Sequence, residues 1–545
     1  MPPTDPDKDA RGRWRDGCLW EKALLDAGVV SMEQRRHANP TRTHPSASVK
    51  RRRAWESGSL SPQTGRGSEG RTIKRIQSRI SSLPFFIVDM LIAIARALQT
   101  PIRRIPMPLR LAAGLLSMLF CLFAAMHAIA ARESVFVTAD ARFYLGIARG
   151  DYSQVMQPFA LRQLGAIFAA ALGHLLHASV EEGFVLEGMF SLVTLLMVIY
   201  AVLLRSSAPG WLLAAIAFLP FWPMLMKEMV LPDLWYSALL ALLLLLLKNE
   251  KMLAASLMMF PLMLSRESTS LTLVCLLAAG WQWLRWRDRW VAVISALAGA
   301  IVVKHLALHA QPNLEHLPET IYMLAKVPWN FSNNVLGLVP WSNVNQSFCS
   351  VPIWKLPVQF GPVQTIGICG FSSLGWMKIT STMLNEFGLL PLLMAFLWWR
   401  RRKIPESVAQ SDLLLRFTLL YGVASLALAP VLGTWISRLV GYAWPMYLVA
   451  LPLQFQPVSR SVLLSKRALA GTGFFCLHLI AVWFSIYQAI RWTWTIQVTV
   501  EFGLWVAGYF LLRFWLGAGK EELGSGDGVG AGIPPANSAA LATGR

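Results

Sequence analysis

Long apolar runs are the feature that most constrains this chain. Residues 109–131, 231–247 and 474–490 are long enough, as helices, to cross a hydrocarbon layer of about 30 Å. Hydrophobic residues supply 55% of the 545 positions and charged residues 15%, and short polar segments separate the apolar runs. Soluble cores are not built from runs of this length. The sequence therefore predicts an all-α integral membrane protein.

The basic charge is placed as in a membrane protein. The net charge is +20, and much of it lies in the first 80 residues and in short connections between apolar runs. Basic residues in such connections orient a membrane protein. No basic run interleaved with aromatic residues forms a groove-binding surface, so nucleic acid is excluded as a partner and the lipid bilayer is expected.

The two ends of the chain are predicted to be disordered. Residues 1–80 are rich in Arg, Ser, Gly and Pro and have no apolar periodicity, which predicts a disordered basic cytoplasmic tail. This tail either attaches to anionic lipid or is a solvated extension without its own activity. Residues 81–108 are expected to include an interfacial amphipathic segment, and residues 519–545 form a second disordered tail.

Loop charges decide the topology, because residues 158–177 are long enough to cross but contain Arg162 and Gln163. If this stretch lies along the outer face, thirteen basic residues of the later loops fall inside and four fall outside. If it crosses, the two sets exchange. The inside set is Arg205, Lys248, Lys251, Arg285, Arg287, Arg289, Arg400, Arg401, Arg402, Lys403, Arg460, Lys466 and Arg467, and the outside set is Lys227, Arg266, Arg438 and Arg491.

The positive-inside rule therefore predicts about twelve spans with an outer-surface helix in the first extracytoplasmic loop. Both termini are cytoplasmic in this topology, in a bacterial-type inner membrane. Residues 109–308 form an N-terminal transmembrane catalytic module, residues 309–383 an extracytoplasmic loop, and residues 384–518 the C-terminal transmembrane helices. Cys349 and Cys369 share that loop and either form a disulfide or remain free thiols.

Ionisable residues gather at the ends of spans on the predicted outer face. Charged groups at such depths are costly, so they pair with one another or contact substrates. The set comprises Asp140, Arg142, Tyr144, Arg162, Glu228, Asp233, Arg266, Glu267 and Arg438.

Asp140 begins a short predicted helix that ends at Gly150 and places Tyr144 on the same face. Two readings of its carboxylate stay open. One is a helix N-cap. The other is a general base at the membrane surface that deprotonates an acceptor hydroxyl.

The order of these features resembles the type C glycosyltransferase superfamily, membrane enzymes that use polyprenyl-phosphate-linked sugars. The resemblance rests on the segment DARFYLGIA at 140–148, on the surface helix that begins with a proline and an aromatic residue, and on a following span that ends at the cytoplasmic Arg205. It covers roughly residues 109–290 and implies that Asp140 is the catalytic base. In some branches further acidic residues assist with a divalent metal, but the segment 227–233 lacks the adjacent acidic pair, so no metal site is predicted.

The resemblance also implies roles for the other outer residues. Arg438, at the start of a late span, and Arg266 are expected to bind the donor phosphate, because a guanidinium group can engage two phosphate oxygens. An ion pair of Arg266 with Glu267 or Asp233 is the equal alternative. Supporting acidic residues are expected at Glu228, Asp233 and Glu267, and further substrate contacts at Arg142, Tyr144 and Arg162.

These features predict a membrane glycosyltransferase that moves a sugar from a polyprenyl-phosphate donor to an extracytoplasmic glycan, lipid or protein acceptor. A polymerase or ligase of lipid-linked glycans shares the outer active face and differs in its acceptor. A secondary transporter or flippase needs charged or broken-helix sites near the midplane. The clustering of ionisable residues at one face favours the enzyme.

Overall fold

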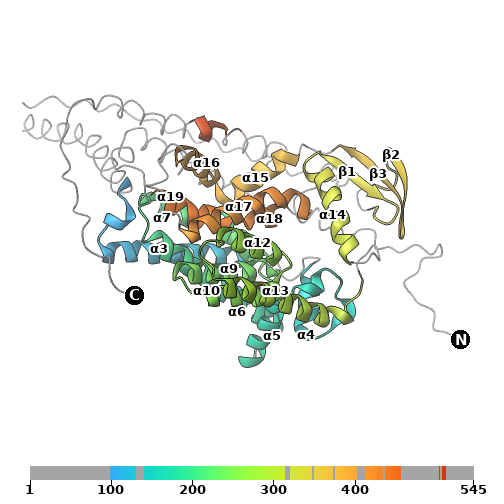
Figure 1. Cartoon of the computed structure of the whole chain (residues 1–545), viewed down its shortest axis with the longest axis horizontal. Coiled ribbons are helices and arrows are strands. Elements are labelled where there is room, and N and C mark those ends of the chain that lie inside the picture. The colour runs from blue at the N-terminus through green and yellow to red at the C-terminus, as the bar shows by residue number, and fades with distance from the viewer. Residues whose placement is uncertain are drawn as a thin grey trace, which may run out of the picture.

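The computed structural model describes residues 99–130, 140–312, 319–346, 349–371, 375–401, 412–433, 436–455, 503 and 506–510. Most of this part is helical, and the helices pack into a bundle with a small sheet at one end (Figure 1). Both predicted tails, residues 81–98 of the interfacial segment and most of the last two predicted spans lie outside it. The helices before residue 310 are α3 (Met107–Ala130), α4 (Ala141–Arg149), α5 (Leu164–Leu175), α6 (Val180–Leu203), α7 (Trp211–Ala217), α8 (Phe221–Lys227), α9 (Pro232–Lys248), α10 (Met252–Leu257), α11 (Met259–Ser265), α12 (Thr269–Ala279) and α13 (Trp286–Leu306). They are followed by α14 (Glu319–Asn334), β1 (Leu338–Ser342), β2 (Trp354–Phe360), β3 (Val363–Phe371), α15 (Gly375–Phe387), α16 (Leu390–Arg401), α17 (Leu413–Leu432), α18 (Ile436–Gly441) and α19 (Leu451–Gln454).

Within the described residues, four helical segments are long and apolar enough to cross a membrane, which is compatible with a membrane protein: Met107–His127, Val180–Leu203, Trp286–His309 and Leu413–Leu432. Other predicted spans are shorter or interrupted helices. Pro220 lies between α7 and α8. A proline disfavours helical backbone at the residue before it, so the helix is interrupted here. Gly388 separates α15 from α16 with a left-handed φ of 56°. The twelve-span arrangement stays a prediction.

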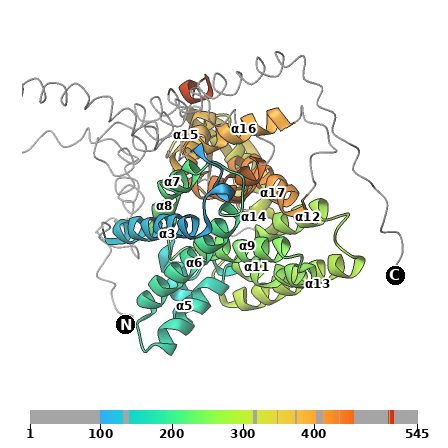
Figure 2. The ribbon, with the colours of Figure 1, turned by 90° about the vertical axis from the view of Figure 1, so that its left-hand side faces the viewer.

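The predicted surface stretch, residues 158–177, contains helix α5. Its 12 residues extend about 18 Å, which is shorter than the hydrocarbon layer. It packs side by side with α6 (Figure 2). The backbones of the two helices approach closely at Gly183, since a Cβ atom there would overlap the carbonyl oxygen of Ala169.

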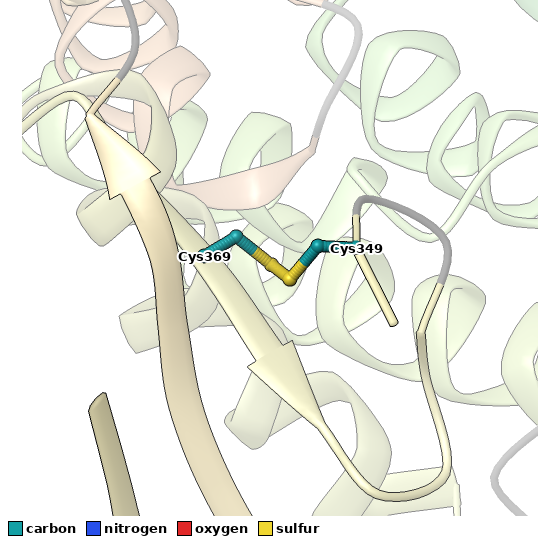
Figure 3. Close-up of a disulfide and its surroundings, with 2 residues drawn as sticks. All are labelled: Cys349 and Cys369. Atoms are coloured by element: carbon teal, nitrogen blue, oxygen red, sulfur yellow. A yellow bond between two sulfur atoms is a disulfide. The ribbon is translucent and has the colours of Figure 1, made fainter. Parts of the chain in front are cut away.

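The predicted loop at 309–383 has a fold of its own. It contains α14 and a three-stranded antiparallel sheet in the order β1-β3-β2. The all-α prediction therefore holds for the bundle and not for this segment. Gly361, with φ 58°, allows the tight turn between β2 and β3. A disulfide joins Cys349 to Cys369 on β3 (Figure 3), so the paired alternative is the one present.

Two asparagines connect α14 to the end of α17. The Asn334 side-chain amide donates to the carbonyl oxygens of Pro430 at 2.9 Å and Gly433 at 2.8 Å. The Asn330 amide donates to the carbonyl oxygen of Val431 at 3.2 Å. Carbonyl groups in the last turn of a helix lack intrahelical donors, and these amides supply them.

Candidate functional site

Arg438 on α18 lies among three carboxylates. Its Nη1 atom is 3.4 Å from Oδ2 of Asp140, its Nε atom is 3.7 Å from Oε2 of Glu228, and Nε donates to Oδ2 of Asp233 at 2.9 Å. Asp140 precedes α4, Glu228 follows α8, and Asp233 lies in the first turn of α9. The fold thus joins residues up to 298 positions apart that the sequence could only assign to the same predicted face.

Asp233 is the most buried member of this group, with a side chain that is 7% exposed. It pairs with both Arg266 and Arg438 and accepts a hydrogen bond from the Tyr442 hydroxyl. The guanidinium carbon of Arg266 lies 4.7 Å from the centre of the Tyr442 ring, which adds a cation–π contact. A buried charge is tolerated when it is paired and hydrogen-bonded. The ion-pair alternative for Arg266 is therefore realised, with Asp233 as its partner.

A second group surrounds Arg162, in the segment between α4 and α5. Its Nε atom donates to Oε2 of Glu267 at 2.9 Å, and its Nη1 atom donates to the Tyr144 hydroxyl at 3.3 Å. Burial raises the pKa of the Glu267 carboxyl, but the charge and hydrogen bonds of Arg162 outweigh burial and hold that pKa at about 2. Burial also raises the pKa of Tyr144. Glu267 is therefore ionised and Tyr144 neutral at neutral pH.

Asp140 occupies the N-cap position of α4, but its side chain makes no capping hydrogen bond. Its carboxylate faces Arg438 instead, and 22% of the side chain is exposed. The N-cap reading is therefore not the role that this side chain has in the structure. Arg142 lies on the exposed side of α4, 4.8 Å from the centre of the Phe143 ring, and is not among the partners described for Arg438.

A cavity of about 160 Å³ adjoins the Arg438 group. Its apolar lining includes Phe221 and Leu225, and its hydroxyl groups come from Ser237 and Tyr442. Its acidic and basic lining residues are Lys227, Glu228, Asp233, Glu386 and Arg438. A mixed lining of this kind suits a polar ligand that also has apolar surface.

Two residues of this site, Glu386 and Tyr442, were not predicted from the sequence. Glu386 lies at the start of the predicted span at 384–399, and an ionisable residue within a span is itself a functional signal. Tyr442 follows Arg438 by one helical turn, but no local pattern indicates that it faces Asp233.

Within the described part of the chain, no three His, Cys, Asp or Glu side chains are grouped so that they could hold a metal ion. The carboxylates of the Arg438 group face guanidinium groups. Charge neutralisation in this group therefore comes from arginine.

No protein-family model matches this chain, and no curated protein matches it. The function has to be argued from the geometry of the Arg438 group and its cavity.

Proposed function

We propose that this chain is a membrane glycosyltransferase that moves a sugar from a polyprenyl-phosphate donor to an extracytoplasmic glycan, lipid or protein acceptor. One observation carries the proposal. The first-loop carboxylate, Asp140, lies against the late arginine, Arg438, and Arg438 lines a cavity of mixed polar and apolar lining. The resemblance to type C glycosyltransferases implies that these two residues are the base and the phosphate contact.

The chemistry requires one base and one cation. The acceptor oxygen attacks the anomeric carbon of the donor sugar, and the bond between that carbon and the phosphate oxygen breaks. The polyprenyl phosphate leaves with the electron pair, and Asp140 takes the proton of the acceptor hydroxyl. A single displacement of this kind inverts the anomeric configuration. Arg438 stabilises the negative charge that develops on the leaving phosphate.

Donor binding also frees the base in this mechanism. Arg438 is held by its 2.9 Å hydrogen bond to Asp233, whereas its Nη1 atom reaches Asp140 only at 3.4 Å. A phosphate oxygen that approaches Nη1 replaces the longer contact, because charge-assisted hydrogen bonds are strongest at about 2.7–2.9 Å. Asp140 is then released toward the acceptor, while Asp233 keeps the arginine in place.

The proposed location is a bacterial inner membrane, with twelve spans, both termini cytoplasmic and the site at the outer face. The convergence of Asp140, Asp233, Arg266 and Arg438 supports this placement, because loop charges assign all of them to the same side. A site at one face favours transfer over transport, which needs a site reached alternately from both sides.

The test is an activity assay on purified full-length protein. Undecaprenyl phosphate carrying radiolabelled glucose, mannose or arabinose serves as donor, and a bacterial envelope extract supplies acceptors. Asp140→Asn should lower transfer by about 10²-fold or more, because an amide cannot accept the proton. Glu181→Gln is the matched control, since Glu181 is also paired with an arginine, Arg149, but at an exposed site.

A fully active Asp140→Asn variant would move the base to Glu228, Asp233 or Glu267. The proposal fails if the parent transfers none of these sugars. Gradient-driven movement of lipid-linked sugar across proteoliposomes by the parent would then identify the transporter alternative.

A further inference from the structure

Glu386 is a buried carboxyl group that the proposed chemistry does not use. It projects from α15 into the cavity beside Arg438, and only 2% of the residue is exposed. Among the described residues, none donates a hydrogen bond to its Oε2 atom. A buried carboxyl oxygen without a donor is costly, and a ligand that donates to it offsets that cost.

The neighbourhood of this oxygen is kept open by a glycine. A Cβ atom at Gly441 would lie 3.1 Å from Oε2 of Glu386 and 3.5 Å from the Phe221 ring. The missing side chain leaves a hydrogen-bond acceptor and an aromatic ring facing the same space. A sugar ring has this combination of needs, because its hydroxyl groups donate hydrogen bonds and its C–H face packs on apolar surface.

The cavity offers different partners to hydroxyl groups and to phosphate groups of a ligand. Glu228 and Asp233 also line the cavity, so three carboxyl groups can accept hydrogen bonds there, and the lining also includes the cation Lys227. Arg438 attracts phosphate oxygens. The cavity thus presents a cation for a phosphate and acceptors for hydroxyl groups, which are the two parts of a glycosyl phosphate.

The size of the cavity limits the ligand to a single ring. Its volume of about 160 Å³ is well below that of sites that enclose drug-sized ligands, which is about 300–1,000 Å³. A monosaccharide unit is of this smaller class. The lipid chain of a donor has to remain outside.

We propose that Glu386 recognises the donor sugar, through a hydrogen bond from a hydroxyl group of a neutral monosaccharide to its Oε2 atom. The inference rests on the proposed glycosyltransferase function and adds its substrate class, a polyprenyl phosphate that carries one neutral sugar with a free hydroxyl group. Arg438 holds the phosphate, and Glu386 distinguishes the sugar-bearing lipid from the bare one.

The experiment compares lipid affinities of full-length protein in detergent. The probes are undecaprenyl phosphate alone and undecaprenyl phosphate carrying glucose, mannose or arabinose. The parent should bind at least one sugar-bearing lipid about tenfold more tightly than the bare lipid, the ratio expected when a ligand donates to a buried acceptor that otherwise has no donor. Glu386→Leu should abolish that preference and leave the affinity for the bare lipid within about twofold of the parent.

Two further measurements separate loss of sugar recognition from loss of folding or of phosphate binding. Glu386→Leu should unfold at a temperature no lower than the parent, because leucine removes a buried polar group without a donor. Arg438→Lys should weaken both kinds of lipid by a similar factor, because it changes the phosphate contact and not the sugar contact.

The outcomes are distinguishable. If the parent binds a sugar-bearing lipid preferentially and Glu386→Leu keeps that preference, the role of Glu386 is refuted while the proposed function stands. An equal loss of affinity for the bare and the sugar-bearing lipid in a stable Glu386→Leu protein also refutes the role of Glu386, since the residue would then support the site as a whole. A parent that binds none of the lipids contradicts the proposed function itself.

Discussion

Replacing Arg438 with alanine removes the cation that three carboxylates share. Removing one partner of a buried ion pair destabilises a protein by about 3–5 kcal/mol, because the remaining charge is left buried and unpaired. Two features place the expected loss near the lower limit. Asp233 keeps Arg266 and the Tyr442 hydroxyl as partners. The side chains of Asp140 and Glu228 are 22% and 29% exposed, so water partly screens them. We expect Arg438→Ala to lower the free energy of unfolding by about 3 kcal/mol.

A double substitution tests the cause of that loss. Asp140→Asn in the Arg438→Ala background should restore about 1 kcal/mol, because it removes a carboxylate that has lost its cation. In the parent background the same change removes a partner of Arg438 and should not stabilise. The measurement is reversible unfolding in mixed micelles, with Arg149→Ala as the control. The exposed Arg149–Glu181 pair should contribute about 0–1 kcal/mol. Strictly additive effects of the two substitutions, or an Arg438→Ala variant as stable as the parent, would refute the shared-cation account.

Three other predictions follow from the structure and the topology. The pKa of Glu267 is lowered to about 2 in the folded protein from an ordinary value near 4.3. The stabilisation that the ionised carboxylate provides is therefore complete above about pH 4.3 and is lost as the pH falls through about 2. Unfolding temperatures measured between pH 6 and pH 3 should therefore fall more steeply for the parent than for Glu267→Gln, and equal slopes would show that the Arg162 pair does not contribute. Gly183→Ala forces a Cβ atom into the Ala169 carbonyl oxygen and should cost about 1–3 kcal/mol in unfolding free energy, whereas Gly370→Ala, whose nearest neighbour would be 3.8 Å away, is the control. A cysteine placed at Ser332 should react with an impermeant thiol reagent on intact cells and one at Ser407 should not, and the reverse pattern would contradict the proposed topology.

The membrane class and the charged residues around Arg438 were predictable because both depend on local chemistry. Apolar runs identify helices that need lipid or protein around them, and charges at the ends of such runs identify Asp140, Asp233 and Arg438 as candidates. The pairing of these residues was not predictable. Asp140 and Arg438 are 298 positions apart and meet only through tertiary packing. A single sequence does not show which distant residues come into contact.

Two other features were missed for different reasons. The sheet formed by β1, β2 and β3 lies in a segment defined only as lying between apolar runs, where Pro and Gly obscure the strand pattern. Glu386 was passed over because the apolar residues that follow it dominated the assignment of a span. A search for isolated charges within apolar runs would have found it.

The hydrogen bonds of Asn330 and Asn334 connect the sheet-bearing segment mechanically to the end of α17. Asn334 holds the carbonyl group of Gly433, five residues before Arg438 in the chain, and α14 leads directly into the sheet-bearing segment. If an acceptor bound to this segment and moved α14, the hydrogen bonds of Asn334 would transmit that movement to the end of α17, close in the chain to Arg438. Acceptor and donor affinities would then be coupled, and by linkage each ligand would alter the binding of the other by the same factor.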